Sequence, residues 1–306
     1  MQPDVSIVIV NYNTPQYTIQ CLESIYKASP KADYEIVLVD NASPDGSAEQ
    51  LEKKYPLIKM VRSGKNSGIA GGNNLGTRAA SGRYILLLNN DTLVKPGAID
   101  LTIEFLNAHP EAAGVGGNLL NEDGSFQSGY IDFHTLGQVF LVLTRLGILL
   151  RPDYPSHPRG TTLKEVDWMS TAFMTFRKDA LESVGLMNEE YFIYSDESDL
   201  QYRIKQQGWK IYYLPELDTI HFGGRSLTPW RRRRLFYRGY LLFFTKHRGP
   251  MQTLLLRVMF VVACLLKLPY WWLSSFISRF KDQAGEEIRS NLDILQMSFR
   301  KGIAPP

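Results

Sequence analysis

The sequence predicts an α/β protein with an open, mainly parallel sheet, and three observations support this. Three continuous apolar segments have the aliphatic composition of strands buried on both faces: residues 5–10, 36–39 and 85–88. Each of them ends in polar side chains, at Asn11, Asp40 and Asn89. Stretches with helical spacing alternate with the strands, which favours right-handed crossover connections. Polar groups at the carboxyl ends of such strands predict a ligand crevice at that edge of the sheet.

The remaining elements of the first 120 residues alternate between helix and strand. Thr14 is expected to cap a helix that starts at Pro15, because threonine suits the N-cap and proline suits the first helical position. Ile19, Leu22 and Ile25 continue this helix with helical spacing. The other predicted elements are helices at 48–55 and 96–108, a weak strand at 59–62, and a helix that follows the glycine-rich segment 68–76 and ends at Gly82.

Residues 121–165 are less regular, and regular structure is expected to return at Asp167. Asp123-Gly124 predicts a hairpin turn. The apolar run 136–150, which Arg145 interrupts, fits either a core helix or a membrane-facing lip. Beyond it the predicted elements are a strand at 169–176, helices at 178–184 and 199–207, and a strand at 209–214 that leads through Pro215 to His221.

The chain changes character after residue 228, which predicts a first domain at 1–228 and a helical tail at 229–306. The cluster Arg231-Arg-Arg-Arg234 precedes apolar and tryptophan-rich stretches, which suits contact with anionic lipid head groups. A solvated helix face is the alternative interpretation of the same cluster.

The apolar run 254–268 in this tail contains Arg257 and Lys267 and is followed by Pro269. An uncharged stretch of about 20 residues would indicate a transmembrane helix, and these residues interrupt it. We therefore expect an interfacial membrane anchor, in preference to a true span or to a packed, self-associating tail that would make a homo-oligomer.

Composition excludes several classes of function. The formal net charge of +3 is too small to predict a nucleic-acid partner. Cys21 and Cys264 are the two cysteines, and neither belongs to a CxxC pair, so we expect a reducing compartment and no zinc site. The apolar run at 5–10 is too short, and has no charged leader, to be a secretory signal.

Several residues at the predicted crevice carry ligand-binding chemistry. A carboxylate at Asp40 can accept hydrogen bonds from a nucleobase, although an Asx-turn or helix cap explains it equally. The glycine-rich segment 66–76 would let the backbone approach a phosphate or sugar, while Asn73 and Asn74 could equally form turns. Asp91 is the anionic residue after the strand at 85–88, so a divalent ion there needs a further ligand, for which His221 is the candidate.

Three carboxylates, Asp196, Glu197 and Asp199, fall within four residues just before a predicted helix. Stabilisation by a helix N-terminus explains one or two of them. Crowding of all three should raise the pKa of at least one, which suits a general base.

Taken in order, these motifs resemble the rhamnosyltransferase-like branch of the inverting family 2 glycosyltransferases, which have the GT-A fold, a Rossmann-like nucleotide-diphospho-sugar transferase fold. The resemblance covers residues 5–226, and its glycine-rich and His-Phe-Gly-Gly segments are the most specific. The matching segments are Ser6-Ile-Val-Ile-Val-Asn-Tyr-Asn13, Val39-Asp-Asn-Ala-Ser43 with Asp45-Gly-Ser47, Asn66-Ser-Gly-Ile-Ala-Gly-Gly-Asn-Asn-Leu-Gly76, Leu88-Asn-Asn-Asp91, Gly185-Leu-Met-Asn-Glu-Glu-Tyr-Phe192, Ser195-Asp-Glu-Ser-Asp-Leu200 and His221-Phe-Gly-Gly-Arg-Ser226.

The resemblance implies transfer of a sugar from a nucleotide-diphosphate donor to a hydroxyl, with inversion at the anomeric carbon and with Mg²⁺ or Mn²⁺ as cofactor. A dTDP- or UDP-sugar is expected as donor, and dTDP-rhamnose is favoured. A lipid-linked or cell-surface glycan is expected as acceptor, at the cytoplasmic face of the cell membrane, where the protein would be peripheral. The alternative is a non-catalytic nucleotide-sugar binding or scaffold protein.

The resemblance also implies roles for individual residues. Asp91 matches the metal-binding acid of the DxD motif, His221 matches a metal ligand, and Glu197 matches the catalytic base, with Asp196 beside it as the other candidate. Two departures weaken the match, because Asn89 replaces the first DxD acid and the base is Glu rather than Asp. Donor contacts are expected at Asn11, Asn13, Asp40, Asn66, Gly68, Asn73 and Asn90, and acceptor contacts at Asp199 and Trp168.

Overall fold

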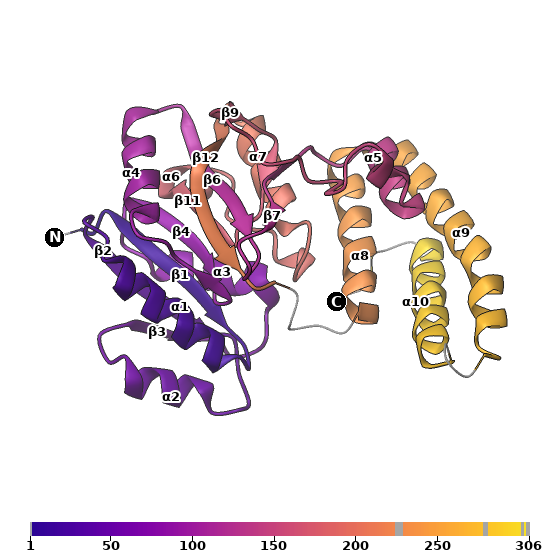
Figure 1. Ribbon diagram of the computed structural model, residues 1–306, viewed down its shortest axis with the longest axis horizontal. Helices are drawn as coiled ribbons and strands as arrows, with labels where there is room; N and C mark the ends of the chain where they lie inside the picture. The colour runs from indigo at the N-terminus through magenta and orange to yellow at the C-terminus, as the bar shows by residue number, and fades with distance from the viewer. Residues whose placement is uncertain (1, 224–228, 278–280, 301–302, 304–306) are drawn as a thin grey trace. The chain divides into compact units, whose positions relative to one another are not determined.

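The computed structural model describes every residue except 1, 224–228, 278–280, 301–302 and 304–306. Contacts divide the chain into two compact units, and Figure 1 labels most of their helices and strands. The first unit comprises Met1–Phe133, Ser156–Phe192 and Asp196–Gly223; the second comprises His134–Pro155, Ile193–Ser195 and Gly224–Pro306. The sequence placed residues 134–155 in the first domain, whereas in the structure they belong with the C-terminal helices.

A mixed sheet forms the centre of the first unit, with the strand order β3-β2-β1-β4-β11-β6-β12-β5. Its first four strands are parallel: β3 (Lys59–Arg62), β2 (Tyr34–Asp40), β1 (Val5–Asn11) and β4 (Tyr84–Asn89). β11 (Phe173–Arg177) runs antiparallel to β4 and to β6 (Ala112–Leu120), and β12 (Lys210–His221) is parallel to β6. The predicted α/β class with a Rossmann-like mixed sheet is therefore confirmed.

Short strands complete this unit. β5 (Thr92–Leu93) and β9 (Lys164–Glu165) pair with β12, and β7 (Phe126–Ser128) pairs with β6. β8 (Tyr130–Ile131) and β10 (Trp168–Met169) form a separate small sheet. The turn between β6 and β7 is the hairpin expected at Asp123-Gly124, because the amide of Gly124 donates to the carbonyl of Asn121 at 2.9 Å.

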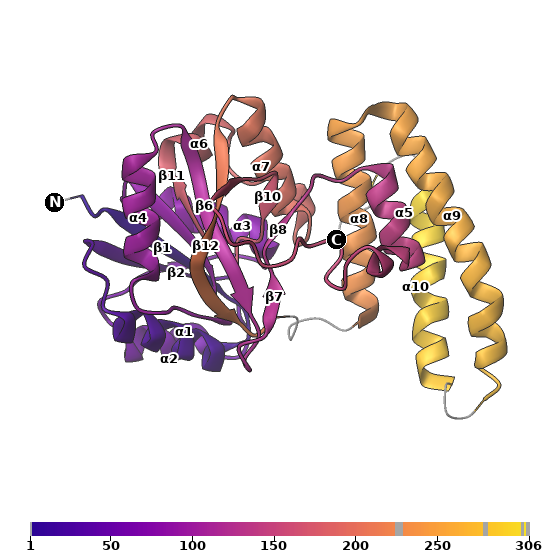
Figure 2. The ribbon, with the colours of Figure 1, turned by 45° about the horizontal axis from the view of Figure 1, so that its top comes forward.

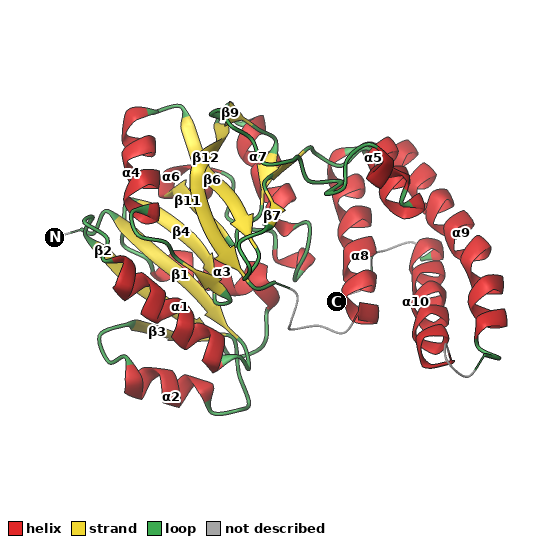
Figure 3. Ribbon diagram, viewed as in Figure 1, coloured by secondary structure: helices red, strands yellow, loops and turns green. Residues whose placement is uncertain are grey.

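Helices cover both faces of the sheet, and each face has its own core. Ile7 and Ile9 of β1 pack with α1 (Pro15–Ala28), α2 (Ser47–Lys54) and α4 (Ala98–Ala108). Val8 points the other way, toward α3 (Gly68–Ala79), α6 (Lys178–Ser183) and α7 (Asp196–Gln206). This division follows from the alternation of side chains along a strand. Figure 3 shows the strands enclosed by helices.

The glycine-rich segment is mostly helix, which differs from its predicted use as a loop around a phosphate or sugar. α3 begins at Gly68, and two of its glycines, Gly72 and Gly76, lie against strands of the sheet. A Cβ on Gly72 would lie 2.7 Å from Val10 Cγ1, well inside ordinary contact. Glycine at this position therefore allows the helix backbone to pack closely on β1.

Three element boundaries also differ from the predictions. The expected strand 169–176 is split into β10 and β11, because Ser170 and Thr171 leave the ladder between them. α7 begins at Asp196, three residues before the expected start, so the acidic cluster forms its first turn. β12 continues beyond Leu214 to His221, with a register shift that accommodates Pro215, which has no N–H to donate.

The second unit is helical (Figure 2). It contains α5 (Leu136–Thr144) with the 3-10 helix η1 (Leu146–Leu149), α8 (Pro229–His247), α9 (Gly249–Ser274) and α10 (Lys281–Phe299). α9 continues through Pro269, and among the described residues it is the helix long and apolar enough to cross a membrane, by length and composition alone. Cys264 in α9, like Cys21 in α1, is buried and free.

Candidate active site

The carboxyl ends of β1 and β2 meet in a buried hydrogen-bond network. Asn11 and Asp40 are register partners, and Asn11 Nδ2 donates to Asp40 Oδ1 at 3.0 Å and to Ser47 Oγ at 2.9 Å. The amide of Ser43, three residues further along the chain, donates to Asp40 Oδ2 at 3.0 Å. Both oxygens of Asp40 are therefore held in place at the strand end.

The turn after β2 and the start of α3 are joined by asparagine side chains. Asn41 Nδ2 donates to the carbonyl of Gly68 at 2.9 Å and to Asn66 Oδ1 at 3.2 Å, while Asn66 Oδ1 also accepts from the amide of Gly68 at 3.0 Å. Asn13 is exposed beside this turn, and its amide donates to Ser43 Oγ. Asn41 was not singled out from the sequence, where it reads as one more turn residue.

Two of the predicted donor contacts have side chains bonded within the protein. Asn73 is buried on α3 with its amide nitrogen 3.7 Å from Met187 Sδ, and the neighbouring Asn74 donates to the carbonyl of Met187 at 2.8 Å. Asn90 Nδ2 donates to Thr14 Oγ1 at 2.7 Å and to Thr18 Oγ1 at 2.9 Å. The structure thus gives both amides partners within the protein, at Met187 for Asn73 and at the start of α1 for Asn90.

Asp91 and His221 lie together, although 130 residues separate them in the sequence. β5 pairs with the end of β12, so that His221 stands opposite Thr92, the residue after Asp91. Asp91 Oδ1 lies 3.3 Å from His221 Nε2, and Asn89 Nδ2 lies 3.4 Å from the same nitrogen. Gly224, Arg225 and Ser226, which complete the motif that starts at His221, lie outside the described residues.

Gln127 on β7 determines which nitrogen of His221 carries the proton. Gln127 Nε2 donates to the carbonyl of His221 at 2.7 Å and to Asn121 Oδ1 at 3.0 Å, which leaves its Oε1 as acceptor at 2.7 Å from His221 Nδ1. Nδ1 therefore bears the hydrogen, and the lone pair of Nε2 faces Asp91. Metal-ligating histidines are commonly oriented by such a second hydrogen bond.

One carboxylate and one imidazole lone pair are a donor set that fits a divalent cation. Mg²⁺ is usually bound by one or two carboxylates, with substrate phosphates and waters as its other ligands, and Mn²⁺ accepts imidazole more readily. Among the described residues, no group of three His, Cys, Asp or Glu side chains could hold a metal ion. Asp91 and His221 would therefore supply the protein ligands, and a diphosphate would supply others.

Glu197, in the first turn of α7, is tied to the loop between β10 and β11. Its Oε1 accepts from Ser170 Oγ at 2.9 Å and from the amide of Thr171 at 3.0 Å. The same loop pairs with β4, because the amide of Asn89 donates to the carbonyl of Ala172 at 3.0 Å. The loop thus connects the carboxylate to the strand that leads into Asp91.

Burial raises the pKa of Glu197, while the hydrogen bonds from Thr171 and Ser170 and the proximity of His221 lower it in part. Asp196 is more deeply buried, and its Oδ2 has no hydrogen-bond partner among the described residues. Burial, followed by the neighbouring charge of Glu197, raises the pKa of Asp196. The crowding expected from the sequence is therefore present in the structure.

The two predicted acceptor contacts are engaged elsewhere. Asp199 is fully buried, and its carboxylate accepts from Arg203 Nε at 2.8 Å and from the hydroxyl of Tyr191 at 3.2 Å. Trp168 is buried in β10, with its indole N–H donating to the carbonyl of Asp132 at 3.1 Å. Both residues have structural roles in the fold, which sequence spacing could not distinguish from exposure to a ligand.

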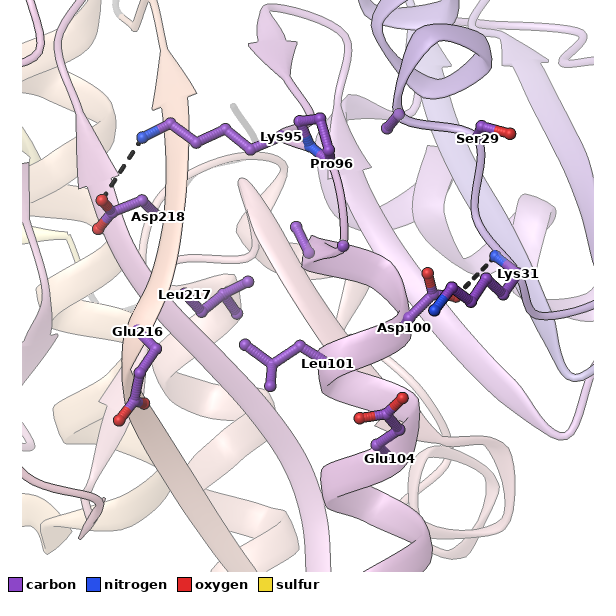
Figure 4. Close-up of a pocket in the computed structure, with 13 residues that line it drawn as sticks. Ser29, Lys31, Lys95, Pro96, Asp100, Leu101, Glu104, Glu216, Leu217 and Asp218 are labelled. Atoms are coloured by element: carbon purple, nitrogen blue, oxygen red, sulfur yellow. Dashed lines mark hydrogen bonds and ion pairs between the residues drawn. The ribbon is translucent and has the colours of Figure 1, made fainter.

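A cavity of about 620 Å³ lies between the end of α1, the start of α4 and β12, and none of the predicted site residues lines it (Figure 4). Two of its carboxylates have protein partners. Lys95 Nζ lies 3.4 Å from Asp218, and Asp100 accepts from the amide of Lys31 at 2.9 Å.

Comparison with known proteins identifies the family of this chain. Residues 6–185 match the family model "Glycosyl transferase family 2". The chain belongs to glycosyl transferase family 2. It is therefore a glycosyltransferase, and the resemblance found in its motifs is confirmed.

One relative of this glycosyltransferase is the Mycobacterium tuberculosis N-acetylglucosaminyl-diphospho-decaprenol L-rhamnosyltransferase, which is 25% identical over 72% of this chain and 76% of its own length. A Pyrobaculum calidifontis mannosyltransferase, solved with GDP-Man and Mn²⁺, has a TM-score of 0.59 at 14% identity over 99% of this chain and 89% of its own. GalNAc-T7, solved with UDP, GalNAc and Mn²⁺, has a TM-score of 0.57 at 17% identity over 79% of this chain and 48% of its own, so this chain spans about half of it. These two structures support the GT-A fold.

Proposed function

We propose that this glycosyltransferase moves a sugar by a single displacement, with inversion at the anomeric carbon, from a nucleotide-diphosphate donor to an acceptor hydroxyl. The proposal rests on the hydrogen bonds from the loop at 170–172 to Glu197. This loop pairs with β4, whose end leads to Asp91 and, beside it, His221. A base and two candidate cation ligands then belong to one site. No covalent enzyme nucleophile is required.

Glu197 is the better base of the two neighbouring carboxylates. Its side chain is partly exposed, and its Oε2 accepts no hydrogen bond from a described residue. Asp196 is only 2% exposed, which leaves it out of reach of an acceptor hydroxyl. The raised pKa of Glu197 also brings it closer to neutral pH, where a general base is most effective.

In this mechanism Glu197 takes the proton of the acceptor hydroxyl while that oxygen attacks the anomeric carbon. The bond between the sugar and the diphosphate breaks on the opposite face, and the nucleoside diphosphate leaves with the bonding electrons. A divalent cation, when held by Asp91 and His221, would stabilise the negative charge of the diphosphate. Asn89 beside them adds no charge of its own, which fits a cation that relies on the donor for its remaining ligands.

The donor side of the site is assigned to the crevice after β1 and β2, formed by Asn11, Asn13, Asp40, Asn66 and Gly68. The name of the mycobacterial relative supports rhamnose as the sugar, and the resemblance to the rhamnosyltransferase-like branch favours dTDP-rhamnose over a UDP-sugar as the donor. The name of that relative also supports a lipid-linked glycan acceptor. We place the protein at the cytoplasmic face of the cell membrane, attached through its C-terminal helices.

The decisive experiment compares Glu197→Gln with Asp196→Asn. A thermal-shift screen of nucleotide-sugars with Mn²⁺ first identifies the donor, and nucleoside diphosphate release is then measured. Glu197→Gln should lower kcat by about 10²–10⁴-fold, with donor affinity retained, because general-base catalysis contributes that much. Glu104→Gln, at an exposed position on α4, is the matched control and should keep full activity. Full turnover by Glu197→Gln would exclude this residue as the base.

A further inference from the structure

Helix α9 turns one unbroken apolar face outward along its whole length. The exposed positions recur every three or four residues, and Leu266 among them is 74% exposed. The exposed large apolar residues on this face are Met251, Leu254, Leu255, Val258, Val262, Leu265, Leu266, Tyr270, Trp272 and Leu273. The opposite positions, including Leu256, Phe260 and Cys264, are buried within the second unit. We call the outward set the α9 stripe.

The charges on α9 leave the stripe intact. Arg257 Nη1 donates to the carbonyls of Ser298 at 2.8 Å and Arg300 at 2.7 Å, at the end of α10. Burial lowers the pKa of Lys267, as does the nearby charge of Arg233 on α8, so Lys267 also faces its neighbours. In the sequence these two residues interrupt an apolar run, whereas in the structure they point away from its exposed face.

A transmembrane orientation of α9 is incompatible with its neighbour α10. α10 packs along α9, and both views of the unit show the two helices side by side (Figures 1 and 2). Asp282, Glu286 and Arg289 on α10 are exposed. Charged side chains in the hydrocarbon are strongly unfavourable, so α10 must remain in water while the stripe faces lipid. This arrangement requires α9 to lie in the plane of the bilayer surface.

The segment from the middle of the sequence adds a second apolar surface. α5 packs against α9, and the residues that follow it leave large apolar side chains uncovered. Leu149 is 79% exposed, and Leu146, Ile148 and Leu150 are exposed with it. Within 136–150 the sequence has one charged residue, Arg145. Placement of α5 beside α9, with this segment directly after α5, could not be foreseen from its position between two parts of the sheet domain.

The charge of the C-terminal helices complements an anionic membrane. Residues 229–306 contain 14 of the 34 Lys and Arg but only 4 of the 31 Asp and Glu, which makes their net charge +10 against −7 for residues 1–228. From residue 229 to residue 274 the sequence contains no Asp or Glu. Basic residues beside an apolar helix face increase its affinity for bilayers that contain anionic lipids.

We propose that the α9 stripe and the segment 146–150 form one composite docking surface for an anionic lipid bilayer, with α9 lying in the plane of the membrane. The proposal deepens the membrane attachment named in the proposed function and does not depend on the transfer chemistry. Its partner is the bilayer itself, and a second copy of the chain is the competing occupant.

Flotation of the full-length purified protein with preformed vesicles tests the proposal. Vesicles of phosphatidylcholine and phosphatidylglycerol in equal parts should carry the protein, and vesicles of phosphatidylcholine alone should carry less. Leu266→Glu and Leu149→Glu should each lower the partition coefficient by at least about tenfold, because each removes a large apolar side chain from the lipid contact. Leu292→Glu, an exposed leucine on α10, is the matched control and should bind as the unaltered protein does.

Three outcomes would overturn the inference. The first is unchanged binding by either Leu266→Glu or Leu149→Glu, and the second is an equal loss of binding by Leu292→Glu. The third is that the unaltered protein does not float with the vesicles and sediments as an oligomer, and that Leu266→Glu dissociates this oligomer. Thermal stabilisation by nucleotide with Mn²⁺ is measured on every variant. If nucleotide with Mn²⁺ still stabilises a protein that fails to float, the proposed membrane-docking surface is wrong and the proposed donor site is unaffected. If nucleotide does not stabilise the unaltered protein, that result counts against the proposed donor site.

Discussion

Replacement of Gln127 by leucine tests whether the orientation of His221 matters for cation binding. Gln127 Oε1 accepts the Nδ1 hydrogen of His221 at 2.7 Å, and Gln127 Nε2 donates to the carbonyl of the same residue at 2.7 Å. Gln127→Leu removes both bonds. The imidazole ring then loses the contacts that direct the Nε2 lone pair toward Asp91.

The expected loss follows from the role of this hydrogen bond. Removal of the outer partner of a metal-ligating histidine typically lowers metal affinity by about 10–100-fold, which corresponds to about 1.4–2.7 kcal/mol. His221 is one of the two protein ligands proposed for the cation among the described residues, so little other coordination would compensate. We expect an effect at the upper end of this range.

Isothermal titration with MnCl₂, in the presence of the nucleoside diphosphate that best stabilises the protein, measures the effect directly. Gln127→Glu is the matched control, because it keeps an acceptor for Nδ1 and loses the donation to the carbonyl of His221. It should retain most of the Mn²⁺ affinity, and melting without metal checks that both variants are folded. The reasoning is refuted if Gln127→Leu binds Mn²⁺ as tightly as the unaltered protein, or if both variants lose affinity equally.

Three further predictions concern the base, the α3 interface and a buried ion pair. Ser170→Ala removes a hydrogen bond that lowers the pKa of Glu197, so this pKa should rise. The acid limb of the kcat/KM profile, where activity rises as this carboxyl loses its proton, should therefore move to higher pH. An unmoved limb would show that the protonation of Glu197 does not control the rate. Gly72→Ala should destabilise the protein by about 1–3 kcal/mol in urea unfolding, since the new Cβ overpacks β1. Gly285→Ala, a helical control with no atom within 4 Å of the new Cβ, should not destabilise it. Arg203→Met should lower the free energy of unfolding by about 3–5 kcal/mol, because it leaves the buried carboxylate of Asp199 uncompensated. Donor affinity should be unchanged in the folded fraction, and weaker donor binding would indicate that Asp199 also contacts a ligand.

The sheet strands were the most predictable part of the fold. β1, β2 and β4 are largely apolar, apart from Ser6 and Glu35, and end in polar residues, so composition located them. β12 was less predictable, because Pro215 is a strong breaker in sequence and a register shift accommodates it in the sheet. The start of α7 was also missed, because its first-turn carboxylates are equally compatible with a loop.

The site was predictable to the extent that it depends on strand ends. Asp91 and His221 lie together in the structure, as expected for residues that follow strands at the same edge of the sheet, and their role as metal ligands stays a prediction. Gln127 was missed because nothing in its neighbourhood separates it from other polar residues near a hairpin. Asp199 was assigned to the acceptor because spacing cannot reveal that its carboxylate faces Arg203 inside the protein.

From its order of residues alone, this chain specifies its strands, its helix-forming stretches and the chemistry gathered at its crevice, since these depend on local composition and on the periodicity of apolar residues. Which side chains meet depends on pairings between distant segments: Gln127 and His221 are 94 positions apart, and Ser170 and Glu197 are 27 apart. Such contacts form only when β6, β7 and β12 pair and when α7 packs beneath the loop before β11. The same holds for the outward face of α9, because packing against α8 and α10 determines which side of an apolar helix remains uncovered.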